Sequence, residues 1–311
     1  MRLLITGVSG MLGHALIRLA SEEHEAWGSY KFHPVSFPQG QTFAMDLVDE
    51  TQVKERVMSL RPEAIVHAAA LTGVDECEKD PLLANRINVQ ATKSLARMAG
   101  ELGAGFIYIS TDYVFDGSKG DYAETDTPSP ISVYGTSKLL GEEAVRASCP
   151  RALVIRTSIF GFNIQNKAGA VEYVLKSLRR GEPITRFADQ FATPIYTGDL
   201  SRLILELLAR GSEGVFHVSG GEKVSRYTFA LKVADVFSLS REMIRPVPFK
   251  HLEGLAKRPR DSSLSGEKVE RHLEMQLPKV EEGLGRLRKD LNFIERSPHP
   301  SLSPFKGRGI R

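Results

Sequence analysis

The stretch Leu3-Leu-Ile-Thr6, followed at once by Gly7-Val-Ser-Gly10-Met-Leu-Gly13, decides how the rest of the chain is interpreted. The first four residues are typical of a short buried strand, and the three glycines after them are typical of a tight turn. Beyond the turn, leucines recur at positions 12, 16 and 19, a spacing that predicts one face of a helix. A strand, a glycine-rich turn and a helix in this order form the context of a dinucleotide-binding loop.

The glycines give this loop its affinity for a dinucleotide. They permit the tight turn and let backbone N–H groups approach a pyrophosphate, and the N-terminus of the helix favours the negative charge. The spacing is GxxGxxG rather than GxGxxG, so a tight turn without a ligand is the alternative. We interpret Gly7, Gly10 and Gly13 as cofactor-binding residues.

Outward from this unit, strand-like and helix-like segments alternate. Strand patterns occur at residues 25–30, 64–67, 105–110 and 152–156, and helical patterns at 50–60, 81–101 and 133–147. Strands and helices at this spacing predict βαβ units and a parallel sheet. The strand at 105–110 is apolar on both faces, as expected where helices cover both sides of a sheet. We therefore predict an α/β fold with a Rossmann-type, doubly wound parallel sheet.

After residue 161 the alternation becomes less regular. Helical patterns occur at 168–180, 198–209, 227–237 and 277–291, with strand patterns at 184–187 and 215–218 and a loop-rich segment at 246–259. Ser225 is the expected N-cap of the third helix. We predict a dinucleotide-binding domain at 1–161 and a smaller C-terminal substrate lobe at 162–296, interleaved with the last Rossmann elements. The segment 297–311, with three prolines and no periodicity, predicts a disordered tail.

Composition excludes several classes of protein. The chain has 311 residues, 41% hydrophobic and 25% charged, which excludes wholesale disorder and a collagen-like chain. Cys77 and Cys149 are too few for a disulfide framework and fit a reducing compartment. The net charge of +3 equals the charge of Lys306, Arg308 and Arg311, so residues 1–296 are neutral and show no nucleic-acid footprint. The apolar runs are shorter than the ~20 residues that span a bilayer, and no signal peptide is visible. We expect a cytoplasmic protein that binds neither membrane nor nucleic acid.

The end of the second strand bears on the choice of cofactor. In the common fingerprint an acid about 20 residues after the glycines binds the ribose 2′-hydroxyl. Here the strand ends at Gly28-Ser-Tyr30-Lys31-Phe-His33 without a carboxylate, and Lys31 is placed to neutralise a 2′-phosphate. This favours NADPH as the cofactor, with NADH as the alternative. Lys31 could instead be a solvated loop lysine without a role in cofactor binding.

A tyrosine and a lysine four residues apart open the helix predicted at 133–147. The motif is Tyr134-Gly-Thr-Ser-Lys138, and this spacing puts both side chains on one helical face. It follows the strand that ends at Ser110-Thr111, and ligands of parallel sheets lie at the carboxyl ends of strands. We expect Lys138 to lower the pKa of the phenol and Tyr134 to exchange a proton with the substrate. A surface tyrosine and lysine are the alternative.

Taken together, these motifs resemble the extended short-chain dehydrogenase/reductase superfamily, and within it the dTDP-4-dehydrorhamnose reductase family. The segments that carry the resemblance span about residues 1–295 in the expected order. They are Gly7–Gly13, Asp46-Leu47, His67-Ala-Ala-Ala70 with Thr72 and Asp75, Ser110-Thr-Asp-Tyr-Val-Phe-Asp-Gly117, Tyr134–Lys138, Arg156-Thr-Ser158 and Arg258-Pro-Arg-Asp-Ser-Ser263.

The resemblance implies a role for individual residues. It implies Thr111, Tyr134 and Lys138 as catalytic residues, with Tyr134 and Lys138 also against the cofactor. It further implies Gly10, Met11 and Leu12 at the pyrophosphate, Asp46 and Leu47 near the adenine, Ala68, Ala69 and Ala70 along the cofactor, and Thr111, Asp112 and Tyr113 at the sugar. Close helix–strand packing is the alternative explanation for the alanines.

Two positions depart from the family pattern. Ile159 stands where the family places a tryptophan against the sugar, and Ala15 stands where it has a glutamate that helps to bind magnesium at a dimer interface. We therefore expect no metal. The regulatory subunit of methionine adenosyltransferase is also similar to this chain, including the Tyr/Lys motif and Gly214-Val-Phe-His-Val-Ser-Gly220. It binds NADP but acts as a partner protein.

The leading hypothesis is an NADPH-dependent reductase of a nucleotide-linked 4-keto-6-deoxyhexose, with Tyr134 as proton donor. Arg258 and Arg260 are candidate partners of the substrate diphosphate, because guanidinium groups match phosphate geometry; two solvated loop arginines are the alternative. A non-catalytic NADP-binding regulatory subunit and an NAD-dependent nucleotide-sugar epimerase are the competing hypotheses. The expected partner is a nucleotide-sugar substrate, with a homodimer as the alternative to a monomer.

Overall fold

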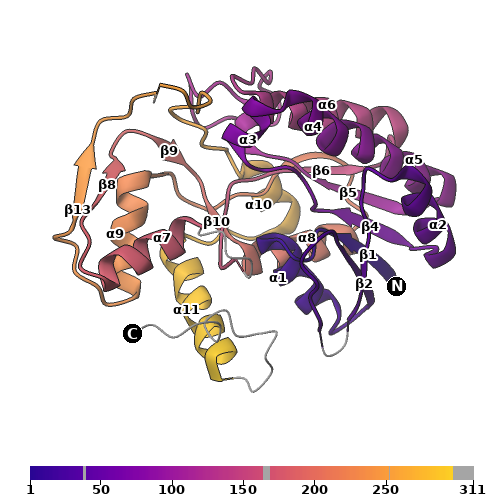
Figure 1. Cartoon of the computed structure of the whole chain (residues 1–311), viewed down its shortest axis with the longest axis horizontal. Coiled ribbons are helices and arrows are strands. Elements are labelled where there is room, and N and C mark those ends of the chain that lie inside the picture. The colour runs from indigo at the N-terminus through magenta and orange to yellow at the C-terminus, as the bar shows by residue number, and fades with distance from the viewer. Residues whose placement is uncertain (38–39, 164–168, 252, 297–311) are drawn as a thin grey trace.

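A parallel sheet of seven strands organises the N-terminal half of the computed structural model, which describes residues 1–37, 40–163, 169–251 and 253–296 (Figure 1). In spatial order the strands are β11 (Gly214–His217), β6 (Leu153–Arg156), β5 (Gly105–Ile109), β4 (Ala64–His67), β1 (Arg2–Thr6), β2 (Glu25–Tyr30) and β3 (Gln41–Ala44). The chain runs outward from β1 to β3 and then returns to β4 on the other side of β1. This reversal makes the sheet doubly wound, and it confirms the predicted fold class.

Alternating residues of the strands build two separate cores. Leu3 and Ile5 of β1 face a cluster with helices α1 (Met11–Ala20) and α8 (Thr197–Ala209). Leu4 faces the opposite cluster, which includes residues of α2 (Glu50–Leu60), α5 (Thr92–Leu102) and α6 (Val133–Ser148). All three side chains are fully buried. Because successive strand residues point to opposite faces, an unbroken apolar strand needs helices on both sides.

The helix predicted at 81–101 is present but is not a regular α-helix throughout. It consists of α4 (Pro81–Asn85), the π-helix η1 (Arg86–Ala91) and then α5. Asp80 caps its start by accepting a hydrogen bond from the Leu83 backbone N–H at 2.9 Å. The short helices α3 (Val74–Lys79) and α10 (Glu267–Leu273) and the 3₁₀ turn η2 (Asp112–Val114) were not predicted. Each is too short for the i, i+3, i+4, i+7 repeat of apolar residues that identifies a helix in a sequence.

The second lobe has its own core beside the sheet (Figure 1). It contains α7 (Ala170–Arg179), α9 (Arg226–Val236), α11 (Val280–Arg296) and the parallel pair β8 (Ile184–Phe187) and β13 (Ile244–Val247). The N-cap prediction is confirmed, because the Ser225 hydroxyl accepts a hydrogen bond from the Thr228 backbone N–H at 3.0 Å. The expected loop at 246–259 needs correction at its start, where residues 246 and 247 extend β13.

Short strand pairs connect this lobe to the sheet. β7 (Ile159–Phe160) runs parallel to β10 (Ile195–Tyr196), and β9 (Phe191–Ala192) runs antiparallel to β12 (Val224–Ser225). α8 and β11 follow in the chain yet pack against α1 and β6, so the chain leaves the sheet after β6 and rejoins it at β11. The predicted tail at 297–311 lies outside the described residues. No described helix has the length and apolar character required to span a membrane.

Candidate active site

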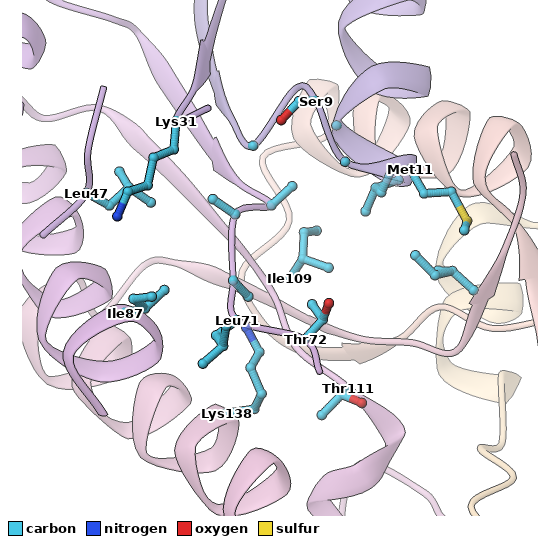
Figure 2. A pocket seen from close by; sticks show the side chains of 18 of the residues that line it. Ser9, Met11, Lys31, Leu47, Leu71, Thr72, Ile87, Ile109, Thr111 and Lys138 are labelled. Carbon is cyan, nitrogen blue, oxygen red and sulfur yellow. The ribbon is translucent and has the colours of Figure 1, made fainter. Parts of the chain in front are cut away.

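A cleft of about 890 Å³ opens at the carboxyl edge of the sheet (Figure 2). It is lined by the loops that follow β1, β2, β4, β5 and β6, because parallel strands end at the same edge. The sequence-predicted residues that line it are Gly7, Gly10, Met11, Leu12, Gly13, Lys31, Asp46, Leu47, Ala68, Ala69, Ala70, Thr111, Asp112, Tyr113, Tyr134 and Lys138. Ile159, which replaces the family tryptophan, lines it too.

The glycine loop leaves no room for side chains. Gly7 has a φ of +76°, and a Cβ atom there would lie 2.7 Å from the Cα atom of Ala69. A Cβ on Gly13 would lie 2.3 Å from the backbone oxygen of Gly7. Gly10 is the N-cap of α1 and provides no side-chain cap, so the first backbone N–H groups of this helix face the cleft without one. Such an end is suited to bind a phosphate group.

Lys31 and Leu47 lie near each other at another side of the cleft (Figure 2), and Asp46, which also lines the cleft, pairs with Lys31. The Lys31 Nζ atom lies 2.9 Å from Asp46 Oδ2, and the two side chains are 39% and 40% exposed. Burial raises the pKa of Asp46, but the hydrogen bond and charge of Lys31 outweigh it and hold the pKa below its ordinary value. The carboxylate that is missing after β2 in the sequence is therefore supplied in space by the loop after β3.

The three predicted catalytic residues come together where β5 ends and α6 begins. Ser132 caps α6 by accepting a hydrogen bond from the Gly135 backbone N–H at 3.2 Å, which places Tyr134 in the first turn. Thr111 is a polar neighbour of the Tyr134 phenol and favours its ionised form. Burial raises the pKa of the Tyr134 phenol above its ordinary value, and Thr111 opposes this only in part. The expected lowering of this pKa is thus wrong for this structure, because desolvation dominates.

Lys138 lies one turn further along α6 and is only 2% exposed. Its Nζ atom lies 4.1 Å from the ring centroid of Tyr108, so the aromatic face provides its contact. Burial lowers the pKa of Lys138 to about 7, against the opposing charges of Glu142 and Cys77. The ammonium group is therefore close to the point at which it loses its charge near neutral pH.

Asp112 lines the cleft but already has partners for both oxygens. Its Oδ1 atom accepts a hydrogen bond from the Thr111 hydroxyl at 3.1 Å, and its Oδ2 atom accepts one from the Ser262 hydroxyl at 2.5 Å. Burial raises the pKa of this carboxyl. Because Ser262 comes from the C-terminal part of the chain, Asp112 joins that part to the end of β5.

Asn88, in the π-helix η1, is a site residue that sequence reasoning missed. Its Oδ1 atom accepts from the Leu71 backbone N–H at 2.8 Å, and its Nδ2 atom donates to the Leu71 carbonyl at 3.0 Å and to the Ser137 hydroxyl at 2.9 Å. Asn88 thus holds the loop after β4, which lines the cleft, against α6. The available signal was a buried amide within a helical pattern, and π-helices occur frequently at functional sites.

The two arginines that the sequence suggested for the substrate diphosphate, Arg258 and Arg260, are not among the described residues that line the cleft. Asp75 holds the guanidinium group of Arg258 with contacts of 2.7 and 2.5 Å. Arg260 is paired with Asp189 at 2.8 Å. Instead, Arg186 and Arg226 line a second cavity of about 320 Å³ in the second lobe, together with Phe187 and other residues.

Tyr113 connects the two cavities. It lines the cleft, where its ring meets that of Tyr134 edge-on with centroids 6.0 Å apart. The positive charge of Arg226, which lines the second cavity, acts on the Tyr113 hydroxyl and opposes the rise of its pKa caused by burial. Tyr113 thus lies between the cleft and the charge of Arg226 in the second cavity.

The chain is similar to known proteins over nearly its whole length. The family model described as RmlD substrate binding domain matches residues 1–293. The "Probable low-salt glycan biosynthesis reductase Agl14" of Haloferax volcanii is 35% identical over 290 residues, covering 91% of this chain and 96% of that protein. Methionine adenosyltransferase 2 subunit beta of Danio rerio is 33% identical over 279 residues, covering 86% and 84%. A crystal structure of dTDP-4-dehydrorhamnose reductase from Bacillus anthracis in complex with NADP has a TM-score of 0.81 at 32% identity, covering 93% and 97%.

Proposed function

The chain belongs to the RmlD substrate-binding-domain family, and from this premise we propose that it is an NADPH-dependent reductase of a nucleotide-linked 4-keto-6-deoxyhexose. The observation that carries the proposal is the meeting of Thr111, Tyr134 and Lys138 at one end of a cleft whose other sides are the glycine loop and Lys31. The comparisons support it, since relatives named as reductases cover nearly the whole chain.

The residues of the cleft fit a dinucleotide. The N-terminus of α1 has no side-chain cap, and Gly10 presents no side chain there, which suits a pyrophosphate. Lys31 is the cation for a 2′-phosphate, and Asp46 beside it is an acceptor for a 2′-hydroxyl. When bound, NADPH supplies the hydride, and the protein contributes position and a proton.

Tyr134 is the proton donor in this proposal. Its phenol is protonated at neutral pH because burial raises its pKa, and Thr111 is its polar neighbour. The proton passes from the phenol to the oxygen of the keto group as that oxygen gains negative charge. Lys138 in its cationic form favours the phenolate that results, because an opposite charge nearby stabilises a charged group.

The second cavity is the proposed site of the substrate nucleotide. Arg186 and Arg226 provide guanidinium groups for a diphosphate, and Phe187 and Phe229 provide apolar walls for a base. Arg258, the candidate from the sequence, is assigned instead to holding the loop at 256–260 against α3 through Asp75.

The test is NADPH consumption with a panel of nucleotide-linked 4-keto-6-deoxyhexoses. We expect turnover with at least one of them and none with the free sugar. The methionine adenosyltransferase relative favours a second candidate, a non-catalytic NADP-binding subunit. Tight NADPH binding without any turnover would support that candidate and contradict the reductase. The epimerase alternative predicts that the purified protein releases NAD on denaturation.

A further inference from the structure

A buried ion pair lies directly behind the catalytic residues. The Glu142 carboxylate is 0% exposed and accepts hydrogen bonds from Arg156 Nε at 3.0 Å and Nη2 at 2.8 Å. The Ser110 hydroxyl donates to the same carboxylate at 2.5 Å. Both Glu142 oxygens therefore have partners, and neither Glu142 nor Arg156 is among the described residues that line the cleft, whereas Ser110 is.

This carboxylate joins the two elements that carry the catalytic residues. Ser110 is the residue before Thr111, at the end of β5. Tyr134, Lys138 and Glu142 follow one another at intervals of four residues along α6, so they share one face of the helix. A single side chain thus sets the position of the end of β5 relative to α6.

Arg156 anchors the pair from the other side. Its Nη1 atom lies 3.5 Å from His217 Nε2, and its guanidinium group lies over the Phe115 ring at 5.2 Å. Burial and the charge of Arg156 lower the pKa of His217 to about 3, so the imidazole is neutral. Its Nδ1 atom lies 2.9 Å from the Tyr122 carbonyl, which assigns the proton to Nδ1 and leaves Nε2 to accept from Arg156.

The charged and titratable groups around Lys138 are few. On its own helix they are Glu142 and Tyr134, from β5 the ring of Tyr108, from α3 Cys77, and from β4 His67. Burial lowers the pKa of His67 to about 3, so this imidazole is neutral. Burial raises the pKa of the Cys77 thiol to about 11 and raises that of Tyr108. Glu142, ion-paired with Arg156 at 2.8 Å, is therefore the carboxylate of this set.

Stability alone does not account for a charge pair at this place. Taking two charges out of water is costly, and a buried ion pair is often matched or exceeded in stability by apolar residues of similar volume. We propose that Glu142, held by Arg156, is a positioning residue for the reduction: it aligns Thr111 with the helix of Tyr134 and places a carboxylate on the helical face that carries Lys138. The inference rests on the proposed function.

The decisive variant is the double change Glu142→Gln and Arg156→Met. It removes both members of the pair together, so neither Glu142 nor Arg156 is left buried without its partner, and Glu143→Gln on the exposed face of α6 is the matched control. We expect a folded protein whose kcat falls at least ~10-fold, while the control changes neither kcat nor pH profile. A carboxylate close to an ammonium group raises its pKa by about one unit or more. Lys138 lines the cleft proposed for the cofactor, so NADPH affinity should decrease as this lysine loses its charge, and in the double variant that decrease should start at a lower pH than in the wild type.

A second variant keeps the test valid if the double variant does not fold. Ser110→Ala retains the ion pair and removes only its bond to the end of β5. We expect kcat to fall ~3- to 10-fold with KM and pH profile unchanged. A folded double variant, or Ser110→Ala, with kcat within twofold of the wild type would overturn the positioning of Thr111.

The two proposals fail in different ways. If the wild type turns over no sugar, the proposed function fails, and the pH dependence of NADPH affinity, measured by calorimetry, still reports on Lys138. A downward shift in the double variant then supports the role of Glu142. An unchanged profile overturns that role even if the enzyme is active.

Discussion

Two lysines line the same cleft and differ in almost every physical respect. Lys138 is 2% exposed, rests on the Tyr108 ring and has a pKa lowered to about 7 by burial. Lys31 has a side chain that is 39% exposed and forms an ion pair with Asp46 at 2.9 Å. Figure 2 shows them on separate sides of the cleft, with Leu71 and Ile87 also on its wall.

The difference shows what burial does to a charge. At Lys138 the surroundings determine whether the amine is protonated near neutral pH, so a small change nearby alters its protonation state and with it the reaction. At Lys31 solvent screens the charge, so the residue adjusts affinity rather than reaction. Mutations on the buried side, near Lys138, should therefore change kcat. Mutations on the exposed side, at Lys31, should change the preference between NADPH and NADH.

The largest effect is expected for Tyr134→Phe, which removes one hydroxyl from the buried side. A positioned acid contributes ~10²- to 10⁴-fold in rate, and kcat should fall by that factor because the proton moves in the transition state. NADPH affinity should change less than about twofold. Steady-state turnover with calorimetry tests this, and Tyr227→Phe, outside both cavities, is the control. Turnover within threefold of the wild type would remove Tyr134 from the mechanism.

Lys138→Met should lower kcat by ~10²-fold and stabilise the fold at the same time. The pKa of Lys138 is about 7 in the fold against 10.5 as the ordinary value, so the unfolded chain binds the extra proton between these pH values. The destabilisation by this lysine is therefore largest below about pH 7 and decreases as the pH rises.

We expect the Tm of the Lys138→Met variant at pH 6 to exceed that of the wild type by a few degrees, with the difference shrinking toward pH 10. Lys93→Met on the exposed face of α5 should show no such pH dependence. The kcat/KM of the wild type, which reports the pKa values of the free enzyme, should also decrease as the pH rises through about 7. A Tm difference that grows with pH would contradict the assignment.

Arg226→Ala tests a guanidinium group of intermediate burial. Because it lines the second cavity and its charge acts on Tyr113, its loss should raise the KM of the nucleotide sugar about tenfold with a smaller change in kcat. Arg180→Ala, on the exposed end of α7, is the matched control. An unchanged KM would place the diphosphate elsewhere.

The smallest effect is expected for Lys31→Ala on the exposed side. The affinity for NADPH should decrease about three- to fivefold while that for NADH stays constant, since only NADPH carries a 2′-phosphate. The loss should diminish at high salt because the site is exposed. Titration of both cofactors with the wild type, Lys31→Ala and the control Lys54→Ala measures it. An equal loss for both cofactors would show that Lys31 does not read the 2′-position.

The sequence by itself determined the parts of the protein that depend on near neighbours in the chain. The glycine loop and the Tyr134–Lys138 pair are each complete within about ten residues, each strand or helix within about twenty, and all were assigned from their spacing. These features can be predicted from the sequence because backbone geometry and helical periodicity depend only on residues that are near one another in the chain. The order of the motifs also determined the family, which the match over residues 1–293 confirms.

Only the tertiary structure decided which distant groups meet. Parallel strands need long crossovers, so residues that share one edge of the sheet are far apart in the chain. Asp46 reaches Lys31 from the next strand, Glu142 meets Arg156 across an interval of 14 residues, and Arg258 meets Asp75 across 183. Burial also arises only there, and it sets the pKa of Lys138 and Tyr134 in directions that no motif contains. Charge and desolvation depend on the whole surroundings of a group, and those surroundings form only when the chain has folded.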